Sequence, residues 1–274
     1  MSSLFEKTFP YGSLLESTTV IRNYASEHKG LGVIACVAVV FGLGPTLRKR
    51  FFAWFNNRVT KMKNEEYEAL KRGAFADLAT QKSSDPEFQK ANGLRILEIG
   101  VGSGTNFSFY PDGSHLTVVD PNPYFADYYY ENKKKFPNIK AETVIVSYGE
   151  DMDMVESNSV DAVVVTLVLC SVKDIAKVIS QIKRVLVPGG RFYFIEHIQE
   201  WDRSSHGYRW ILQHILTWFK IWPFLFEGCN LNRNPLPFIQ SVGFSDVQYE
   251  RLYAPMPAKV FMIASPHLKG IATK

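Results

Sequence analysis

Arg95-Ile-Leu-Glu-Ile-Gly-Val-Gly-Ser-Gly-Thr105 contains the strongest structural signal in this chain. Its first five residues are mostly apolar and predict a short buried strand of a parallel sheet. The strand ends where Gly100, Gly102 and Gly104 alternate with other residues, and glycine lets the backbone turn tightly and come close to a ligand. Because the following segment is compatible with a helix, we expect the loop to point backbone N–H groups toward that ligand. The first hypothesis is therefore a nucleotide-like cofactor.

Glu98 distinguishes this loop from a dinucleotide-binding loop. The pattern G-x-G-x-G lacks the wider last gap of G-x-G-x-x-G, and a carboxylate at the strand end would repel a pyrophosphate. S-adenosylmethionine carries a sulfonium and an ammonium group but no phosphate, so it fits the loop, with Glu98 near its cationic amino-acid part. A glycine-rich turn that binds nothing is the alternative.

Two further acidic segments follow predicted strands. Leu116–Asp120 is a second apolar strand, and Asp120 at its tip is the candidate that holds the ribose hydroxyls of an adenosine. Asp120 is also a suitable cap for the helix that follows, and the two roles are compatible. A third strand, Ala141–Val146, precedes polar candidates for the adenine edge, with an ordinary acidic loop as the alternative. These candidates are Gly149, Glu150 and Asp151.

Strands and helices alternate through the rest of the chain. Asp161–Leu169 predicts a fourth strand that is buried on both faces, and Lys173–Leu186 predicts a helix with one apolar face. Arg191–Ile195 predicts a fifth strand, and 247–253 with 260–263 predict a hairpin. Repeated β-α units indicate an α/β fold with an open parallel sheet and helices on both faces.

The motifs together resemble those of class I S-adenosylmethionine-dependent methyltransferases. The general motifs are Glu98–Gly104, Asp120, Gly149–Asp151, Asp161 at the start of a strand, and Val185–Gly190. Shorter peptides resemble the membrane-associated methyltransferase-like proteins that methylate small thiols: Asp120–Pro123, Val165–Ser171, Glu196-His197 and Gly228–Leu231. The resemblance extends from about residue 93 to the C-terminus.

The resemblance implies a Rossmann-like, seven-stranded, mostly parallel sheet with an antiparallel terminal strand. It adds Pro121, Asn122 and Leu167 to the expected cofactor-binding residues. It also implies a small lipophilic acceptor, most simply an alkyl or aryl thiol. An oxygen- or lipid-directed methyltransferase and a catalytically silent membrane-bound scaffold are the alternatives.

The acceptor side is expected beyond the carboxyl ends of the strands. His197 follows the fifth strand, and we expect it to act as a base or to polarise the acceptor; a histidine bonded to a backbone carbonyl is the competing interpretation. No Asn/Asp-Pro-Pro-Tyr/Phe peptide follows the fourth strand, which disfavours amino methylation. The aromatic segment Tyr208–Phe226, within residues 200–235, is expected to cap an apolar acceptor site or to touch a membrane, with core packing as the alternative.

The N-terminal part predicts attachment to a membrane. Residues 1–29 are a polar leader, and Gly30–Leu47 carries no charge, near the minimum length for a spanning helix. A basic and aromatic flank follows and extends the anchor to residue 55, which predicts that the catalytic domain faces the cytosol. The resemblance implies attachment to the endoplasmic reticulum membrane or to lipid droplets. Whether the segment spans, loops into or lies on the membrane stays open. Residues 56–92 form an amphipathic helix and linker, and 93–274 form the methyltransferase domain.

Composition limits other functions. The net charge of +4 over 274 residues, without a dense basic stripe, does not indicate a nucleic-acid binder. Cys36, Cys170 and Cys229 are widely spaced and indicate neither a disulfide framework nor a zinc site. The sequence carries no signal for an oligomeric state.

Overall fold

The computed structural model describes residues 44–62 and 64–274. The polar leader and nearly all of the predicted membrane segment therefore lie outside the described residues. Within the described ranges, no helix combines the length and apolar character needed to cross a bilayer. The chain divides into two units, Met1–Arg48 and Lys49–Lys274, and everything below concerns the second.

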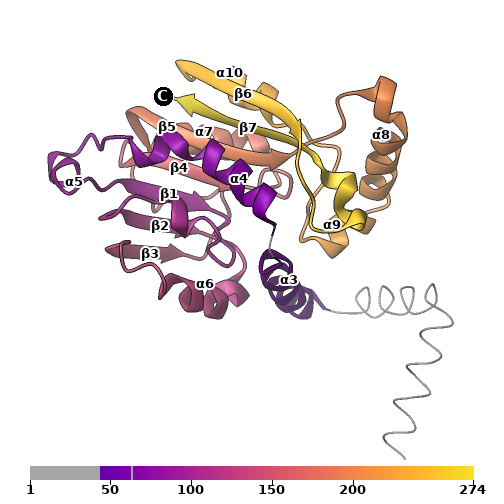
Figure 1. Ribbon diagram of the computed structural model, residues 1–274, viewed down its shortest axis with the longest axis horizontal. Helices are drawn as coiled ribbons and strands as arrows, with labels where there is room; N and C mark the ends of the chain where they lie inside the picture. The colour runs from indigo at the N-terminus through magenta and orange to yellow at the C-terminus, as the bar shows by residue number, and fades with distance from the viewer. Residues whose placement is uncertain (1–43, 63) are drawn as a thin grey trace, which may run out of the picture. The chain divides into compact units, whose positions relative to one another are not determined.

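A seven-stranded sheet organises this unit (Figure 1). The strand order is β3-β2-β1-β4-β5-β7-β6, and only β7 runs antiparallel to its neighbours. This confirms the predicted mostly parallel, Rossmann-like sheet with an antiparallel terminal strand. The strands are β1 (Arg95–Ile99), β2 (His115–Val119), β3 (Ala141–Ile145), β4 (Val160–Thr166), β5 (Leu186–His197), β6 (Asp246–Tyr253) and β7 (Pro266–Thr273).

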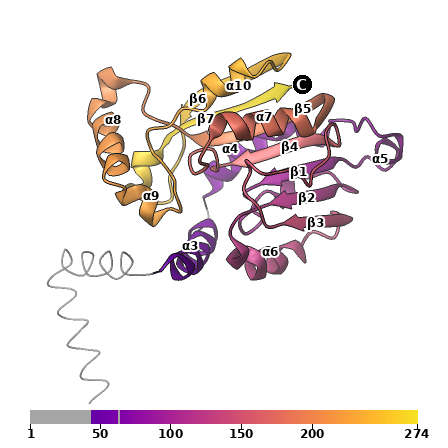
Figure 2. The ribbon, with the colours of Figure 1, turned by 180° about the vertical axis from the view of Figure 1, so that it is seen from behind.

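Helices cover both faces of the sheet, with α4 and α7 on opposite sides (Figures 1 and 2). The α-helices are α3 (Pro45–Thr60), α4 (Glu65–Ala74), α5 (Pro86–Lys90), α6 (Ala126–Lys133), α7 (Ile175–Val185), α8 (Arg203–Trp218), α9 (Ile221–Leu225) and α10 (Leu236–Ser241). The described residues also form four 3-10 turns: η1 (Ala76–Ala79), η2 (Phe107–Phe109), η3 (Pro123–Phe125) and η4 (Lys259–Ala264).

The buried apolar side chains form two clusters, one on each face of the central strands. Leu97 and Val163 belong to the cluster that α7 covers, whereas their neighbours Ile96 and Ala162 belong to the other. Successive strand side chains point to opposite faces, so strands buried on both faces read as continuous apolar runs. The predicted apolar face of α7 is buried at Ile175, Val178, Ile179, Ile182 and Val185.

The structure corrects two predicted elements. The segment after the glycine loop, which is compatible with a helix in sequence, forms only the short turn η2; Pro111 follows soon after and has no N–H for a helical bond. The second strand of the terminal hairpin is β7 rather than 260–263, which forms η4. The apolar pattern misplaced this strand because β7 contains Gly270, where a Cβ would lie 2.3 Å from the Gln248 carbonyl oxygen.

Three segments expected to be a continuous helix or a linker contain a break or a further short helix in the structure. The amphipathic region breaks between α3 and α4, where the Asn64 side chain accepts a hydrogen bond from the Tyr67 N–H (3.1 Å) and caps α4. The aromatic segment 208–226 breaks between α8 and α9, where Lys220 has φ +58°. The linker at the end of the predicted segment 56–92 contains the short helix α5, which Asp85 caps.

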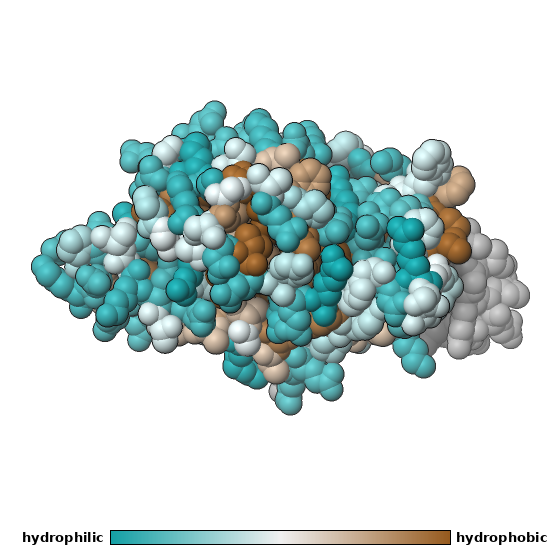
Figure 3. Space-filling view, turned by 90° about the horizontal axis from the view of Figure 1, so that it is seen from above, coloured by the Kyte–Doolittle hydropathy of each residue, from teal (hydrophilic) through white to brown (hydrophobic). Residues whose placement is uncertain are grey.

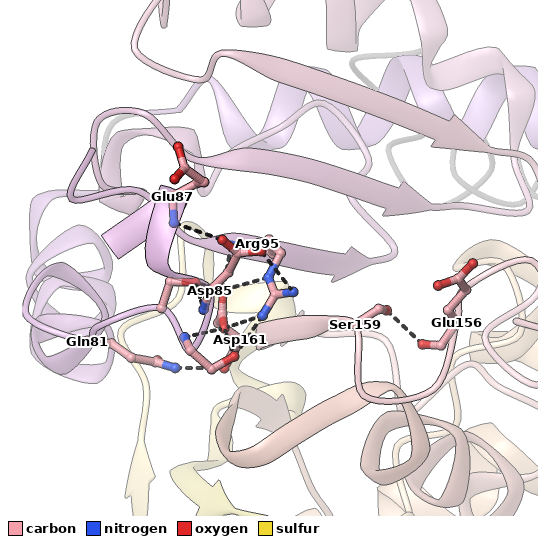
Figure 4. A network of polar contacts seen from close by, with 9 residues as sticks. Gln81, Asp85, Glu87, Arg95, Glu156, Ser159 and Asp161 are labelled. Carbon is pink, nitrogen blue, oxygen red and sulfur yellow. Dashed lines mark hydrogen bonds and ion pairs between the residues drawn. The ribbon is translucent and has the colours of Figure 1, made fainter. Parts of the chain in front are cut away.

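Asp161 ties the segment before β1 to the amino ends of β1 and β4 (Figure 4). Its carboxylate is 1% exposed and accepts hydrogen bonds from Arg95 Nη2 (2.9 Å), Ser83 Oγ (2.7 Å) and the Ser84 N–H (3.0 Å). Burial raises the pKa of Asp161, but these bonds outweigh it and lower the pKa to about 2. This network lies at the end of the sheet opposite the glycine loop and holds the fold together.

Candidate functional site

The glycine loop at the carboxyl end of β1 requires glycine at each of its three positions. Gly100, Gly102 and Gly104 have φ values of +69°, +52° and +76°, which strain any other residue. A Cβ at Gly100 would lie 2.3 Å from Val168 Cγ2, and one at Gly104 would lie 2.2 Å from the Phe107 ring. At Gly102 the nearest atom would be 3.7 Å away. Packing therefore requires two of the glycines, whereas only the backbone conformation requires the third, Gly102. We expect a ligand to approach the backbone there.

Glu98 lies beneath this loop and is 2% exposed. Its carboxylate accepts hydrogen bonds from Asn106 Nδ2 (2.8 Å) and Tyr110 Oη (2.6 Å). Burial raises the pKa of Glu98 to about 7, although both bonds oppose the shift. The structure thus gives Glu98 a role in holding the chain after the loop, and its contact with a cationic ligand stays a prediction.

Asp120 follows β2 directly, as predicted, and connects to the loop. One carboxylate oxygen accepts the Gly102 N–H (3.0 Å), and the other accepts the Asn122 N–H (2.8 Å). Burial raises the pKa of Asp120, and these backbone bonds oppose the shift. The sequence thus places an acid beside the loop backbone, where the hydroxyls of a sugar are expected.

The residues after Asp120 fasten this corner to distant parts of the unit. The Pro121 carbonyl accepts a hydrogen bond from Lys49 Nζ (2.9 Å). Asn122 is buried, and its Nδ2 donates to the Lys49 carbonyl (3.1 Å) and to Glu227 Oε2 (3.0 Å). The start of the unit and the segment after α9 therefore meet beside Asp120, a contact that the sequence did not reveal.

The Gly149–Asp151 segment lies past β3 and divides into different roles. A Cβ at Gly149 would lie 3.1 Å from Ile99 Cγ2, so the backbone here packs on the end of β1. Glu150 Oε1 accepts the N–H groups of Lys173 (2.6 Å) and Asp174 (3.1 Å) ahead of α7, whereas its Oε2 is buried without a partner. Asp151 is exposed and pairs with the Lys177 ammonium at 2.8 Å. Of these two carboxylates, Glu150 is the one with a buried acceptor that lacks a partner.

Leu167 follows β4 with φ +59°, a conformation that is strained for a leucine. Its N–H donates to the Ile195 carbonyl (2.9 Å), while the side chain is 41% exposed. The next residue, Val168, packs against Gly100, so the turn after β4 and the glycine loop are neighbours. Backbone strain beside a ligand-binding loop is typical of functional sites.

Glu196 and His197 end β5 and are both buried. Glu196 Oε1 accepts the Val168 N–H (2.9 Å), and burial raises the pKa of Glu196 to about 7 despite this bond. His197 Nε2 lies 2.8 Å from Cys229 Sγ, and its Nδ1 has no partner. The competing interpretation, a histidine bonded to a backbone carbonyl, therefore does not describe His197.

Two residues of α4 lie beside the site. Lys71 of α4 is 2% exposed and donates to the Thr105 carbonyl (2.7 Å), so it ties α4 to the chain after the glycine loop. Tyr67, one turn earlier, has a buried hydroxyl without a partner and packs edge-on against the ring of His267. A charged residue on an amphipathic helix looks like a surface residue, so the sequence did not mark Lys71.

The residues present fit S-adenosylmethionine. Three buried acceptors have no partner among the described residues: Asn106 Oδ1 past β1, Glu150 Oε2 past β3, and Glu196 Oε2 near the carboxyl end of β5. The ammonium, ribose hydroxyls and adenine amino group of this cofactor are hydrogen-bond donors, which such acceptors complement. Carboxylates at these places would disfavour a phosphate.

Comparison with known proteins agrees with this geometry. A family described as a methyltransferase domain matches residues 97–194. Thiol S-methyltransferase TMT1A of Homo sapiens is 37% identical over 85% of this chain and 90% of its own length. Thiol S-methyltransferase TMT1B of Rattus norvegicus is 34% identical over 86% of this chain and 91% of its own length.

A solved structure is similar to this chain in its fold. It is a complex between the Trm112 methyltransferase activator of Haloferax volcanii and a putative methyltransferase, with a TM-score of 0.53 and 15% identity over 82% of this chain and 96% of the other. The relatives of higher identity carry the assignment, because a fold is shared by proteins of different activities. The chain is an enzyme that uses S-adenosylmethionine, and it belongs to the methyltransferase family that includes the mammalian thiol S-methyltransferases.

Proposed function

We propose that this methyltransferase transfers the methyl group of S-adenosylmethionine to the sulfur of a small lipophilic thiol. The observation that carries the proposal is the 37% identity with a thiol S-methyltransferase over 85% of the chain. Thiols suit the chemistry, since a thiolate is a soft nucleophile that forms near neutral pH. The cofactor supplies an electrophilic methyl group on a sulfonium, so the protein needs chiefly to align the acceptor and relieve it of a proton.

His197 is the residue that we propose acts on the acceptor. It lies at the carboxyl end of β5, and the neighbouring strand β4 leads into the turn that packs on the glycine loop. Its ring is 5% exposed, with one nitrogen facing a sulfur atom and the other without a partner. A buried imidazole in this place is suited to take the proton of an acceptor or to polarise it.

The acceptor side carries an unusual exposed apolar surface. Trp218 and Phe219 at the end of α8 are 82% and 67% exposed, and Tyr208 and Ile211 on the same helix are 66% and 53% exposed. The face of the protein shown in Figure 3, in contrast, is mostly hydrophilic with separate apolar areas. Aromatic residues of this kind settle at the headgroup level of a membrane. They support a lipophilic acceptor that reaches the site from a bilayer.

We propose that the protein resides on the endoplasmic reticulum membrane or on lipid droplets, with the catalytic domain facing the cytosol. The charge-free segment Gly30–Leu47 and the basic run Arg48–Arg50 support this orientation. Flotation of the full-length protein with membranes, and protease sensitivity of the catalytic domain in sealed microsomes, test the proposal. Protection of the catalytic domain from protease would reverse the orientation.

The acceptor is tested with matched compounds that differ only in the reacting atom. Full-length protein in detergent is incubated with methyl-labelled cofactor and an alkyl thiol, an aryl thiol, or the corresponding alcohol, phenol or amine. We expect labelled thioether from the thiols and no product above background from the other compounds. Preferential methylation of the phenol or of added lipid would replace the proposal with an oxygen- or lipid-directed activity.

Two variants separate the roles of the site residues. Asp120→Asn is expected to weaken cofactor binding, whereas His197→Ala is expected to retain cofactor binding and lose turnover. The control is His115→Ala, because His115 is exposed at the opposite end of β2. Unchanged turnover of His197→Ala would remove the imidazole from the reaction, and cofactor binding by the wild type with no methylation of any compound would favour a scaffold.

A further inference from the structure

Three soft metal ligands converge beside the site, although the sequence keeps them far apart. Cys170 follows the end of β4, His197 is the last residue of β5, and Cys229 follows α9. Their ligand atoms lie within 4.8 Å of one another. The three residues are 3%, 5% and 8% exposed, so the cluster is shielded from water.

Hydrogen bonds hold the two cysteines in place from outside the cluster. Asn230 donates its backbone N–H (2.9 Å) and its Nδ2 (3.2 Å) to the Cys170 carbonyl, which fixes the turn after β4 to the segment containing Cys229. Trp222 Nε1 donates to Cys229 Sγ at 3.2 Å. An indole N–H can only donate, so the Cys229 sulfur accepts this bond, as the sulfur of a thiol or of a thiolate can.

We propose that Cys170, His197 and Cys229 bind one Zn²⁺ ion. Two thiolates and one imidazole are a ligand set that selects zinc among the common divalent ions. Ligands at the usual bond lengths of about 2.0–2.3 Å around a tetrahedral zinc lie roughly 3.5 Å apart, within the spread of this cluster. Spacing along the sequence concealed the site, because its three ligands come from separate turns that only the sheet brings together.

The site has three protein ligands, which leaves one position of a tetrahedral ion open. Within residues 44–62 and 64–274, no fourth histidine, cysteine or carboxylate joins the group. Structural zinc sites usually have four protein ligands, whereas three protein ligands with an exchangeable fourth are typical of catalytic ones. The open position is therefore available to a small molecule.

We assign that position to the acceptor thiol, a step that rests on the proposed function. The thiol releases its proton to solvent and binds as a thiolate, since coordination to zinc deprotonates a thiol. A sulfur lone pair then forms the new bond to the methyl carbon while the bond between methyl and sulfonium breaks, and its electron pair stays on the departing sulfur. Zinc keeps its oxidation state throughout. His197 polarises the acceptor by holding the ion.

Metal content tests the site independently of methylation. Full-length protein purified without chelators is analysed by inductively coupled plasma mass spectrometry, and we expect about one zinc per chain. Cys170→Ser and Cys229→Ser are each expected to reduce the zinc content by roughly tenfold or more. Cys36→Ser is the matched control and should retain the metal. Cofactor binding by each variant checks that the loss of metal does not reflect unfolding.

Cobalt substitution tests the open position. Co²⁺ in place of zinc should give thiolate-to-cobalt charge transfer and the visible bands of a tetrahedral ion, and an alkyl thiol should shift these bands while the matched alcohol does not. Folded wild-type protein that binds cofactor but takes up neither zinc nor cobalt would overturn the site, as would a Cys170–Cys229 disulfide found by peptide mapping under reducing purification. A cobalt spectrum that thiols leave unchanged would overturn the assignment of the fourth ligand.

The two proposals fail in different ways. If metal-free protein methylates thiols at the wild-type rate, the proposed function stands and the assignment of the acceptor thiol to the zinc fails. If the protein holds zinc but methylates no thiol, the site stands and the proposed function fails.

Discussion

Replacing Asp161 with asparagine is expected to lower the free energy of unfolding by about 2.5–3 kcal/mol at neutral pH. A pKa lowered from 3.8 to about 2 corresponds to about 2.5 kcal/mol in favour of the ionised carboxylate. Breaking a buried ion pair costs about 3–5 kcal/mol. Since Arg95 remains 24% exposed and can reach water, the low end of that range applies.

The assay is urea unfolding of the full-length protein, followed by pulse proteolysis. With a slope of about 2–3 kcal/mol/M, the midpoint of the variant should fall by about 1 M. Asp112→Asn, at an exposed carboxylate in a turn, is the control and should leave the midpoint unchanged. An Arg95→Met change combined with Asp161→Asn should cost less than the sum of the two single changes, because the residues share their interaction.

The dependence on pH supplies a second readout. The folded state holds Asp161 with a lowered pKa, so its contribution is fully present above about pH 4 and is lost as the pH falls toward 2. The variant lacks this part of the acid sensitivity. Cofactor binding at low temperature should persist, because Asp161 lies at the opposite end of the sheet. A midpoint equal to that of the wild type, or a loss no larger than that of the Asp112 control, would refute the reasoning.

Three further outcomes follow from the site. Gly104→Ala should unfold at a lower urea concentration than the wild type, because the added Cβ would meet the Phe107 ring. Gly102→Ala should lose cofactor affinity with a smaller loss of stability. Equal urea midpoints for the two variants would contradict this expectation. In metal-free protein, Glu196→Gln should flatten the dependence of stability on pH between about 4.5 and 7, because the raised pKa of about 7 favours the folded state at low pH and this advantage is lost as the pH rises; a pH profile matching the wild type would count against it. Leu167→Gly should relieve about 1 kcal/mol of backbone strain, but glycine also adds entropy to the unfolded chain, so its urea midpoint reports the balance of the two effects. Asparagine tolerates this backbone conformation better than leucine and does not add the chain entropy of glycine. Leu167→Asn should therefore raise the urea midpoint above that of the wild type.

The sequence determined the sheet and the places of the candidate cofactor residues. Alternation of short apolar runs with amphipathic helices is a local pattern, and β1, β2 and β4 follow it closely. The glycine loop and Asp120 could also be placed, because the carboxyl ends of parallel strands meet at one edge of a sheet. Elements whose boundary depends on packing were less predictable, and β7 is the clearest case: Gly270 is required there by the backbone of β6 and by the ring of Phe194.

Only the tertiary structure decided which side chains share an environment. Glu98 receives its hydrogen bonds from Asn106 and Tyr110, and no local pattern marks either residue as its partner. Cys170, His197 and Cys229 each look like isolated buried residues along the chain. They meet because β4 and β5 are neighbours in the sheet and because the segment after α9 returns to their carboxyl ends. The local sequence pattern determines where a strand forms, whereas long-range packing determines which side chains meet beyond its carboxyl end.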